Sequence, residues 1–206
     1  MQSASNDIKT PWAVLLFTAA YLLAAVVGAS VTGNREFVFY LVVMAILIAV
    51  VFGVHRRIHI PNALLWALSI WGLLHMAGGL LPIPSHWPHE PPNAVLYSWW
   101  VIPQRLKYDQ FVHAYGFGVT TWLCYHGLCS IALDYSVRLR PSFGVLTICA
   151  VAGMGFGSLN EIIEFVAVLS LPNTNVGGYI NTGWDLVSNA VGCVAAAVAI
   201  RLGYSR

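Results

Sequence analysis

Six long apolar segments constrain the fold of this chain more than any other feature. Each is close to the ~20 residues that an α-helix needs to cross ~30 Å of hydrocarbon. Inside a bilayer every backbone N–H and C=O group must find its partner within the protein, which favours helices. We therefore expect an all-α, polytopic transmembrane helical bundle with about six spans. The predicted spans are residues 12–31, 37–54, 62–82, 109–133, 143–170 and 184–202.

The composition agrees with this interpretation and excludes several classes of protein. Hydrophobic residues make up 58% of the 206 residues and charged residues only 9%, whereas soluble domains carry about 25% charged residues. A soluble enzyme, a disordered protein and a nucleic-acid binder are therefore excluded, and we expect one transmembrane domain over residues 1–206. The four cysteines lie in apolar runs without C-x-x-C spacing and are expected to pack as small hydrophobic residues.

The first apolar segment has a second interpretation, as a secretory signal peptide. Val27-Gly28-Ala29 would serve as a cleavage site. However, Lys9 is the only basic residue before the segment, and the segment exceeds the ~7–15 apolar residues of a typical signal peptide. We therefore expect a retained first helix.

Basic residues predict the orientation, because they concentrate on the cytoplasmic side. With the N-terminus inside, seven of the ten Lys and Arg residues lie inside and three outside. The inner residues are Lys9, Arg56, Arg57, Arg138, Arg140, Arg201 and Arg206, and the outer ones are Arg35, Arg105 and Lys107. Both termini are thus predicted to be cytoplasmic, with outer loops at residues 83–108 and 171–183.

The longer outer loop is rich in proline and tryptophan. Prolines prevent a regular helix over its first half, so we expect a loose loop there. Residues 97–100 (Tyr-Ser-Trp-Trp) suit an interfacial segment, because aromatic rings settle at headgroup depth. His86, His89 and Glu90 could cap a site as a lid or bind a metal, although the prolines favour the loose loop.

Four acidic residues lie in or at the mouths of predicted spans: Asp109, Glu161, Glu164 and Asp185. Ionisable groups at membrane depth are costly and usually face the interior of a bundle. Other acids, Glu36 among them, are placed in tails, loops or span ends, where they need no explanation.

The spacing of these residues pairs them with other polar residues. Asp109 is four residues from His113, Glu161 three from Glu164, and Asp185 four from Asn189, so each pair shares a helix face. The predicted topology brings all the pairs into the outer half of the membrane. We expect a single polar pocket there, lined by His75, Asp109, His113, Asn160, Glu161, Glu164, Asp185 and Asn189.

Several of these segments resemble a known family. Tyr108-Asp109-x3-His113 resembles the Y-D-x-x-x-H motif of the bacterial YjdF-like membrane proteins, the DUF2238 family. Residues 160–164 are similar to its N-E-x-x-E motif, residues 184–189 to its W-D-x-x-x-N motif, and His75 with Gly78 to its H-x-x-G segment. The resemblance covers about residues 70–200 and implies a multi-pass protein of the bacterial inner membrane. It supplies no reaction.

The chain also resembles VanZ-like proteins more broadly. Those carry D-x-x-x-H, then an acidic helix, then D-x-x-x-N-x-x-G, which corresponds here to Asp109-x3-His113, Glu161 and Asp185-x3-Asn189-x2-Gly192. This resemblance implies a related architecture.

The polar residues favour a metal-assisted membrane enzyme. Carboxylates and imidazole are suitable ligands for Zn, Mn or Fe, and bundles build metal sites from paired ligands on neighbouring helices. In this hypothesis Asp109, His113, Glu161 and Asp185 hold the metal, and Glu164 is the general base. The residues expected to take part in catalysis are Glu164, Asp109 and His113. A lipid or a lipid-linked envelope intermediate is the expected substrate, with membrane lipids as the surroundings.

Two other functions stay open at this point. Intramembrane Asp, Glu and His residues also form proton relays, so a proton or cation transporter is one alternative. Interhelical hydrogen bonds can also hold a bundle together without chemistry, so a structural or partner-binding protein is the other. The sequence names no substrate and no oligomeric state.

Overall fold

Six α-helices make up most of the computed structural model, which describes residues 11–91, 93–172 and 174–204. They are α1 (Trp12–Thr32), α2 (Arg35–Ile58), α3 (Asn62–Leu80), α4 (Tyr108–Asp134), α5 (Phe143–Ser170) and α6 (Tyr179–Tyr204). The predicted all-α transmembrane bundle is confirmed: in the described part of the chain all these helices except α4 are both long and apolar enough to cross a membrane.

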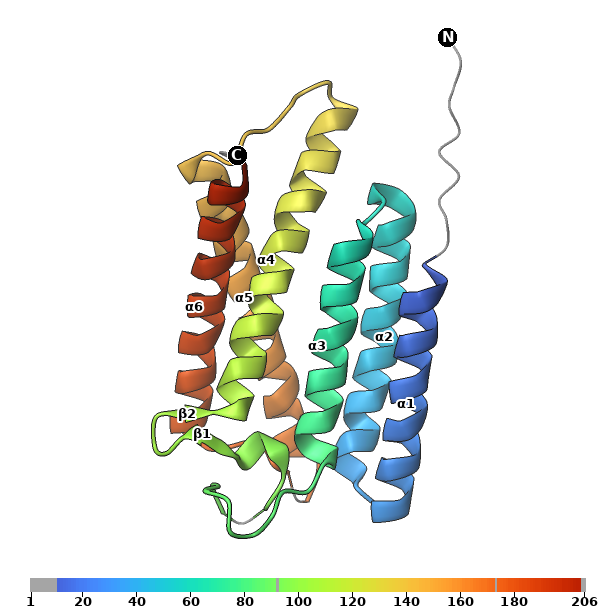
Figure 1. Ribbon diagram of the computed structural model, residues 1–206, viewed down its shortest axis with the longest axis vertical. Helices are drawn as coiled ribbons and strands as arrows, with labels where there is room; N and C mark the ends of the chain where they lie inside the picture. The colour runs from blue at the N-terminus through green and yellow to red at the C-terminus, as the bar shows by residue number, and fades with distance from the viewer. Residues whose placement is uncertain (1–10, 92, 173, 205–206) are drawn as a thin grey trace.

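The helices form two groups of three (Figure 1). In one group α3 packs against α1, and α1 against α2; in the other, α4, α5 and α6 all contact one another. The contact between α3 and α4 joins the two groups, so α4 has helices on several sides. This central position accommodates the less apolar sequence of α4, because most of its residues from Tyr108 to Thr121 are buried against protein.

The outward faces of the bundle are strongly apolar. Leu16 of α1 is 69% exposed, Phe143 of α5 is 89% exposed and Ile180 of α6 is 71% exposed. A water-soluble protein rarely exposes apolar surface on this scale. The exposed side chains therefore form the lipid-facing surface of a membrane protein.

Glycines let the helices α4, α5 and α6 approach one another closely. A Cβ atom on Gly192 of α6 would overlap the backbone carbonyl of Ala114 in α4. A Cβ atom on Gly157 of α5 would lie 2.6 Å from Nδ2 of Asn189 in α6. Small residues at such positions are the usual device for close helix packing in membranes, and here they bring polar side chains of different helices within reach of one another.

Residues 81–91 and 93–107 are held by backbone hydrogen bonds rather than loose, so that prediction was wrong. They contain a short 3-10 helix, η1 (Leu96–Ser98), and an antiparallel hairpin of β1 (Trp100–Ile102) and β2 (Leu106–Lys107). Backbone hydrogen bonds cross the segment, from the N–H of Ile83 to the carbonyl of Ala94 and from the N–H of Trp100 to the carbonyl of Pro88. The segment also packs against α3 and α4. Proline prevents a regular helix, but the N–H and carbonyl groups of the neighbouring residues can still form hydrogen bonds across the segment.

The two ends of the bundle carry different connecting segments (Figure 1). The hairpin, η1 and the α1–α2 turn lie at one end, and the α4–α5 connection with Arg138 and Arg140 lies at the other, beside the last described turn of α6. Which end faces the cytoplasm stays a prediction. Lys9 and Arg206, two of the residues used for it, lie outside the described residues.

Candidate functional site

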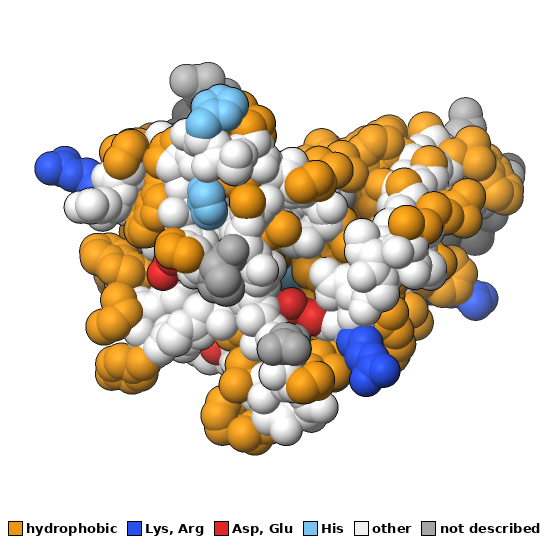
Figure 2. All heavy atoms as spheres, turned by 90° about the horizontal axis from the view of Figure 1, so that it is seen from below, with side chains coloured by type: hydrophobic (Ala, Val, Ile, Leu, Met, Phe, Trp, Pro, Cys, Tyr) orange, Lys and Arg blue, Asp and Glu red, His pale blue; other side chains and the backbone are white. Residues whose placement is uncertain are grey.

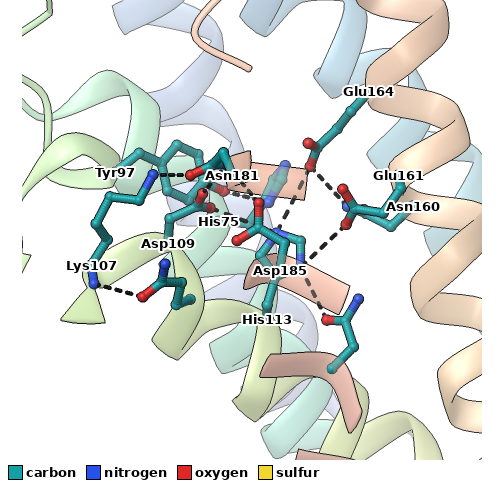
Figure 3. A network of polar contacts seen from close by, with 12 residues as sticks. His75, Tyr97, Lys107, Asp109, His113, Asn160, Glu161, Glu164, Asn181 and Asp185 are labelled. Atoms are coloured by element: carbon teal, nitrogen blue, oxygen red, sulfur yellow. Dashed lines mark hydrogen bonds and ion pairs between the residues drawn. The ribbon is translucent and has the colours of Figure 1, made fainter. Parts of the chain in front are cut away.

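His113 lies at the centre of a cluster of carboxylates contributed by α4 and α5 (Figure 3). Its Nε2 atom is 3.6 Å from Oδ1 of Asp109 and 3.9 Å from Oε1 of Glu164. Its Nδ1 atom is 3.5 Å from Oε1 of Glu161 and 3.0 Å from Oδ1 of Asn189 in α6. The side chain is buried, with 6% of His113 exposed. Both ring nitrogens therefore face oxygen atoms that accept hydrogen bonds.

This arrangement needs an additional proton or a cation between the ring and the acids. A neutral imidazole carries one N–H hydrogen, so its other nitrogen presents a lone pair. Because both nitrogens of His113 face acceptor oxygens, the nitrogen without hydrogen would repel its neighbours. The repulsion is removed when one of the facing carboxyl groups carries a proton and donates to the ring, when a second proton occupies the ring, or when a cation sits among the lone pairs.

Asn181 orients two more carboxylate oxygens. Its Nδ2 atom donates to Oδ2 of Asp109 at 3.3 Å and to Oδ2 of Asp185 at 2.5 Å. Its Oδ1 atom accepts from Nζ of Lys107, which also contacts Oε2 of Glu90 at 2.8 Å. The Lys107 contact identifies the side-chain atom of Asn181 that faces it as the oxygen, because the ammonium group can only donate. Asn181 thus engages the Oδ2 atoms of both aspartates and leaves their Oδ1 atoms free for other partners.

Several buried oxygen atoms of the site lack a hydrogen bond. Within the described residues, Oδ1 of Asp185 and both Oε atoms of Glu161 are buried without a hydrogen-bond partner. Asp185 is fully buried, and Glu161 is 9% exposed. An uncompensated buried carboxylate is strongly destabilising, so these atoms need a proton, a cation or a donor such as a water molecule to compensate them.

The ligand atoms form two groups that could each hold a metal ion. Asp109, His113 and Asp185 make one group, and His113, Glu161 and Glu164 make the other. In each group the donor atoms lie within 4.8 Å of one another, and two atoms that bind one ion with bonds of ~2.0–2.3 Å lie at most ~4.6 Å apart. Only small movements are needed to close either group around an ion. Of the four expected ligands, Glu161 falls in the second group.

A small polar pocket adjoins this cluster. It has a volume of about 30 Å³ and is lined by carboxylates of three helices: Glu36 of α2, Asp109 of α4 and Glu164 of α5. This volume exceeds the ~10–15 Å³ that a water molecule needs. Figure 2 looks onto this end of the bundle, where acidic side chains lie among uncharged ones and hydrophobic side chains surround them.

Glu36 corrects one sequence expectation. We expected Glu36 to need no explanation at its span end, but it is 7% exposed, and its Oε2 accepts a hydrogen bond of 2.9 Å from the backbone N–H of Asn175. The reason is that α2 begins at Arg35, so Glu36 lies in its first turn, within reach of the backbone N–H of Asn175. A buried acid beside other acids belongs to the site.

His75 lies at the edge of the cluster, with an aromatic partner. Its Nδ1 atom and the hydroxyl of Tyr97 share a hydrogen bond of 2.5 Å. Burial, followed by nearby acids such as Asp109, raises the pKa of the Tyr97 hydroxyl well above its usual range, so the phenol stays neutral. Both residues line the polar pocket. Tyr97 comes from η1 and fixes the ring of His75 rather than contacting His113.

A family described as "Predicted membrane protein (DUF2238)" matches residues 11–205, which is nearly the whole chain. The chain belongs to the DUF2238 family. No curated protein matches it, and neither does any solved structure. The resemblance to VanZ-like proteins stays a prediction.

In this DUF2238 protein the residues of the three sequence motifs meet. Asp109 and His113 come from the first motif, Glu161 and Glu164 from the second and Asp185 from the third, and all lie in the cluster around His113 (Figure 3). Asn189 contacts the ring of His113 directly. Asn160 donates from Nδ2 to Oε1 of Glu164 at 2.8 Å, and His75 lines the adjoining pocket.

The sequence did not identify four residues of the DUF2238 site: Glu36, Tyr97, Lys107 and Asn181. Asn181 lies four residues before Asp185, so its helical spacing was a usable signal once α6 is known to begin at Tyr179. Lys107 and Tyr97 carried no such signal, because the hairpin and η1 bring them to the site.

Proposed function

We propose that this protein is a metal-dependent membrane enzyme that acts on a lipid or a lipid-linked substrate. The observation that carries the proposal is the position of His113, whose two ring nitrogens both face acceptor oxygens within 3.9 Å. A divalent cation among these groups removes their repulsion and compensates several buried acids together. Carboxylate and imidazole ligands suit Zn, Mn or Fe.

In this proposal Asp109, His113 and Asp185 hold the ion. Asn181 supports the two aspartates from behind, as the outer partners of metal ligands commonly do. Glu161, which we also expected as a ligand, would bind a second ion or supply additional negative charge. An ion held by these residues would supply a water molecule of lowered pKa as a nucleophile at neutral pH.

Glu164 is the proposed general base. Its carboxylate lines the 30 Å³ pocket beside Asp109, where a water molecule has room, and Asn160 holds its Oε1 atom. It would take a proton from the water as the water oxygen bonds to a phosphoryl or ester group, and it would return that proton to the alcohol oxygen that leaves as its bond to the group breaks. The site lies at the end of the bundle that we predict to face the outer leaflet of the bacterial inner membrane, so headgroups of that leaflet are the nearest substrates.

Elemental analysis of the detergent-purified protein tests the proposal. We expect near-stoichiometric metal in the wild type and its loss in Asp109→Asn and Asp185→Asn. The control is Asp134→Asn, which removes an exposed acid at the far end of α4 and should keep the metal. Metal-loaded protein should also convert lipids in phosphatidylglycerol vesicles to new products detectable by mass spectrometry. Absence of metal after loading with Zn, Mn and Fe would refute the proposal.

A proton or cation transporter is the second candidate, and Glu161 favours it. Both carboxylate oxygens of Glu161 are buried without a hydrogen-bond partner among the described residues, which is typical of a group that gains and loses a proton. Proton flux in liposomes that Glu161→Gln abolishes, together with the absence of bound metal, would support this alternative. A folded protein with neither metal nor flux would instead indicate a structural or partner-binding role.

A further inference from the structure

An apolar cavity of about 380 Å³ lies between α1, α2 and α3 and reaches α5. Its walls include Val14 of α1, Met44 and Leu47 of α2, and Leu65 and Leu68 of α3. Ligand-binding pockets typically measure ~300–1,000 Å³. The cavity is therefore large enough for part of a hydrophobic molecule, and it is separate from the smaller polar pocket.

The lipid bilayer around this cavity can supply a hydrocarbon chain to fill it. Among its lining residues, Leu15, Leu47 and Phe52 belong to the exposed, lipid-facing surface. Water gains little in a cavity with apolar walls, whereas a hydrocarbon chain restores the dispersion contacts of those walls. A chain from the bilayer can thus enter between α1 and α2.

The cavity is long enough for an extended chain. It runs along α2 from Tyr40 to Arg56, which is ~24 Å at a rise of ~1.5 Å per residue. One leaflet supplies about half of the ~30 Å hydrocarbon thickness. An acyl chain that starts at the Tyr40 end therefore fits within the cavity without leaving it.

The cavity and the acid site meet at shared residues. Tyr40 and His75 line both the apolar cavity and the polar pocket of Glu36, Asp109 and Glu164. We propose that the cavity binds one acyl chain of a membrane lipid, whose polar end lies at Tyr40 and His75, next to the carboxylates. This proposal rests on the proposed function, because it names the substrate as a lipid whose headgroup linkage is presented to the metal site.

The opposite direction, with the headgroup at His55 and Arg56, fits less well. Arg56 already lies over the ring of Phe52, with 5.8 Å from Cζ to the ring centre. A chain in that direction would place its terminal methyl group against His75 and Asn160, whose polar atoms would gain no partner from it. When the headgroup linkage of a lipid lies at the His75 end, its oxygen atoms can instead pair with the polar atoms of His75 and Asn160.

Photocrosslinking tests the direction and the place of the chain. The probes are two phosphatidylglycerols in proteoliposomes, one with a diazirine near the ester and one with a diazirine near the terminal methyl. We expect the first to label residues near Tyr40 and His75, and the second to label residues near Val51 and Leu65. The reverse order of labelling, or labelling spread over the lipid-facing surface without enrichment in the cavity, would overturn the proposal.

A cavity-filling variant makes the test specific. Met44→Trp places a large ring in the cavity, whereas Val42→Trp on the same helix is a control, because Val42 is 58% exposed and does not line the cavity. Met44→Trp should lower cavity labelling about tenfold, which corresponds to about 1.4 kcal/mol of binding free energy, and Val42→Trp should leave it unchanged. Equal labelling in both variants would refute the acyl-chain site.

Metal content distinguishes this proposal from the function on which it rests. Met44→Trp should keep its metal and lose lipid turnover, because Met44 lines the apolar cavity and is not one of the proposed metal ligands. If the wild type binds no metal but shows the expected labelling order, the cavity proposal holds and the enzyme proposal fails. If metal and turnover persist in a Met44→Trp protein that no longer labels, the substrate chain does not use the cavity.

Discussion

Replacing Asn181 with alanine should weaken metal binding without removing a metal ligand. Asn181 donates to Oδ2 of Asp109 at 3.3 Å and to Oδ2 of Asp185 at 2.5 Å, and it accepts from Nζ of Lys107. The alanine variant loses all three contacts at once. The two aspartates then lose the group that holds their carboxyl groups in position.

The expected magnitude follows from the number and place of these contacts. Loss of an outer partner of a metal ligand typically lowers metal affinity by ~10–100-fold, which is about 1.4–2.7 kcal/mol. Asn181 supports two ligands that belong to the same group of donor atoms, so we expect the upper part of this range. Asp109→Asn removes a proposed ligand itself and should abolish binding.

Isothermal titration of metal-stripped protein in detergent with Mn or Zn measures this difference. The control is Asn93→Ala at the same end of the bundle, because Asn93 is exposed and its Nδ2 atom bonds to Asn175 rather than to a carboxylate. Its affinity should match that of the wild type. An Asn181→Ala protein with wild-type affinity, beside an Asp109→Asn protein that binds nothing, would refute the supporting role of Asn181.

Three further results are expected. Gly192→Leu should lower the free energy of unfolding by ~1–3 kcal/mol, because its side chain would meet the Ala114 carbonyl, whereas Gly203→Leu in the same helix has open space; thermal unfolding of both in detergent checks this. Metal added at about 100 times its dissociation constant should stabilise the wild type by ~2.7 kcal/mol, and a similar rise in the melting temperature of Asp185→Asn would contradict the ligand assignment. Glu164→Gln should keep the metal but lose ~10²–10⁴-fold in lipid turnover, and retained turnover in that variant would exclude Glu164 as the base.

The helical bundle could be predicted from the sequence because it depends on local chemistry. Long apolar runs have few ways to satisfy their backbone groups in lipid, so the spans follow from composition alone. The helix ends were less predictable. The α2 helix runs from Arg35 to Ile58 and includes polar residues at both ends, because a helix continues beyond the hydrocarbon as long as its backbone bonds are satisfied.

The core of the candidate site could also be predicted, for a related reason. Helical spacing of three or four residues places two side chains on one face, so Asp109 with His113 and Glu161 with Glu164 were recognisable pairs. The antiparallel order of consecutive spans then put the pairs at similar depth. Their distances from one another were not predictable, since these depend on how far each helix is rotated and on how closely the helices approach.

The sequence by itself determined that this chain is a membrane bundle and which acids lie inside it, because hydropathy and helical period act over a few neighbouring residues. Only the tertiary structure decided that His113 is the common neighbour of the carboxylates. It also decided that Glu36 and Asn181 belong to the site and that Tyr40 joins the polar pocket to the apolar cavity. These relations arise from contacts between segments far apart in the chain, where the rotation of each helix and the close approach at glycines such as Gly192 set the geometry.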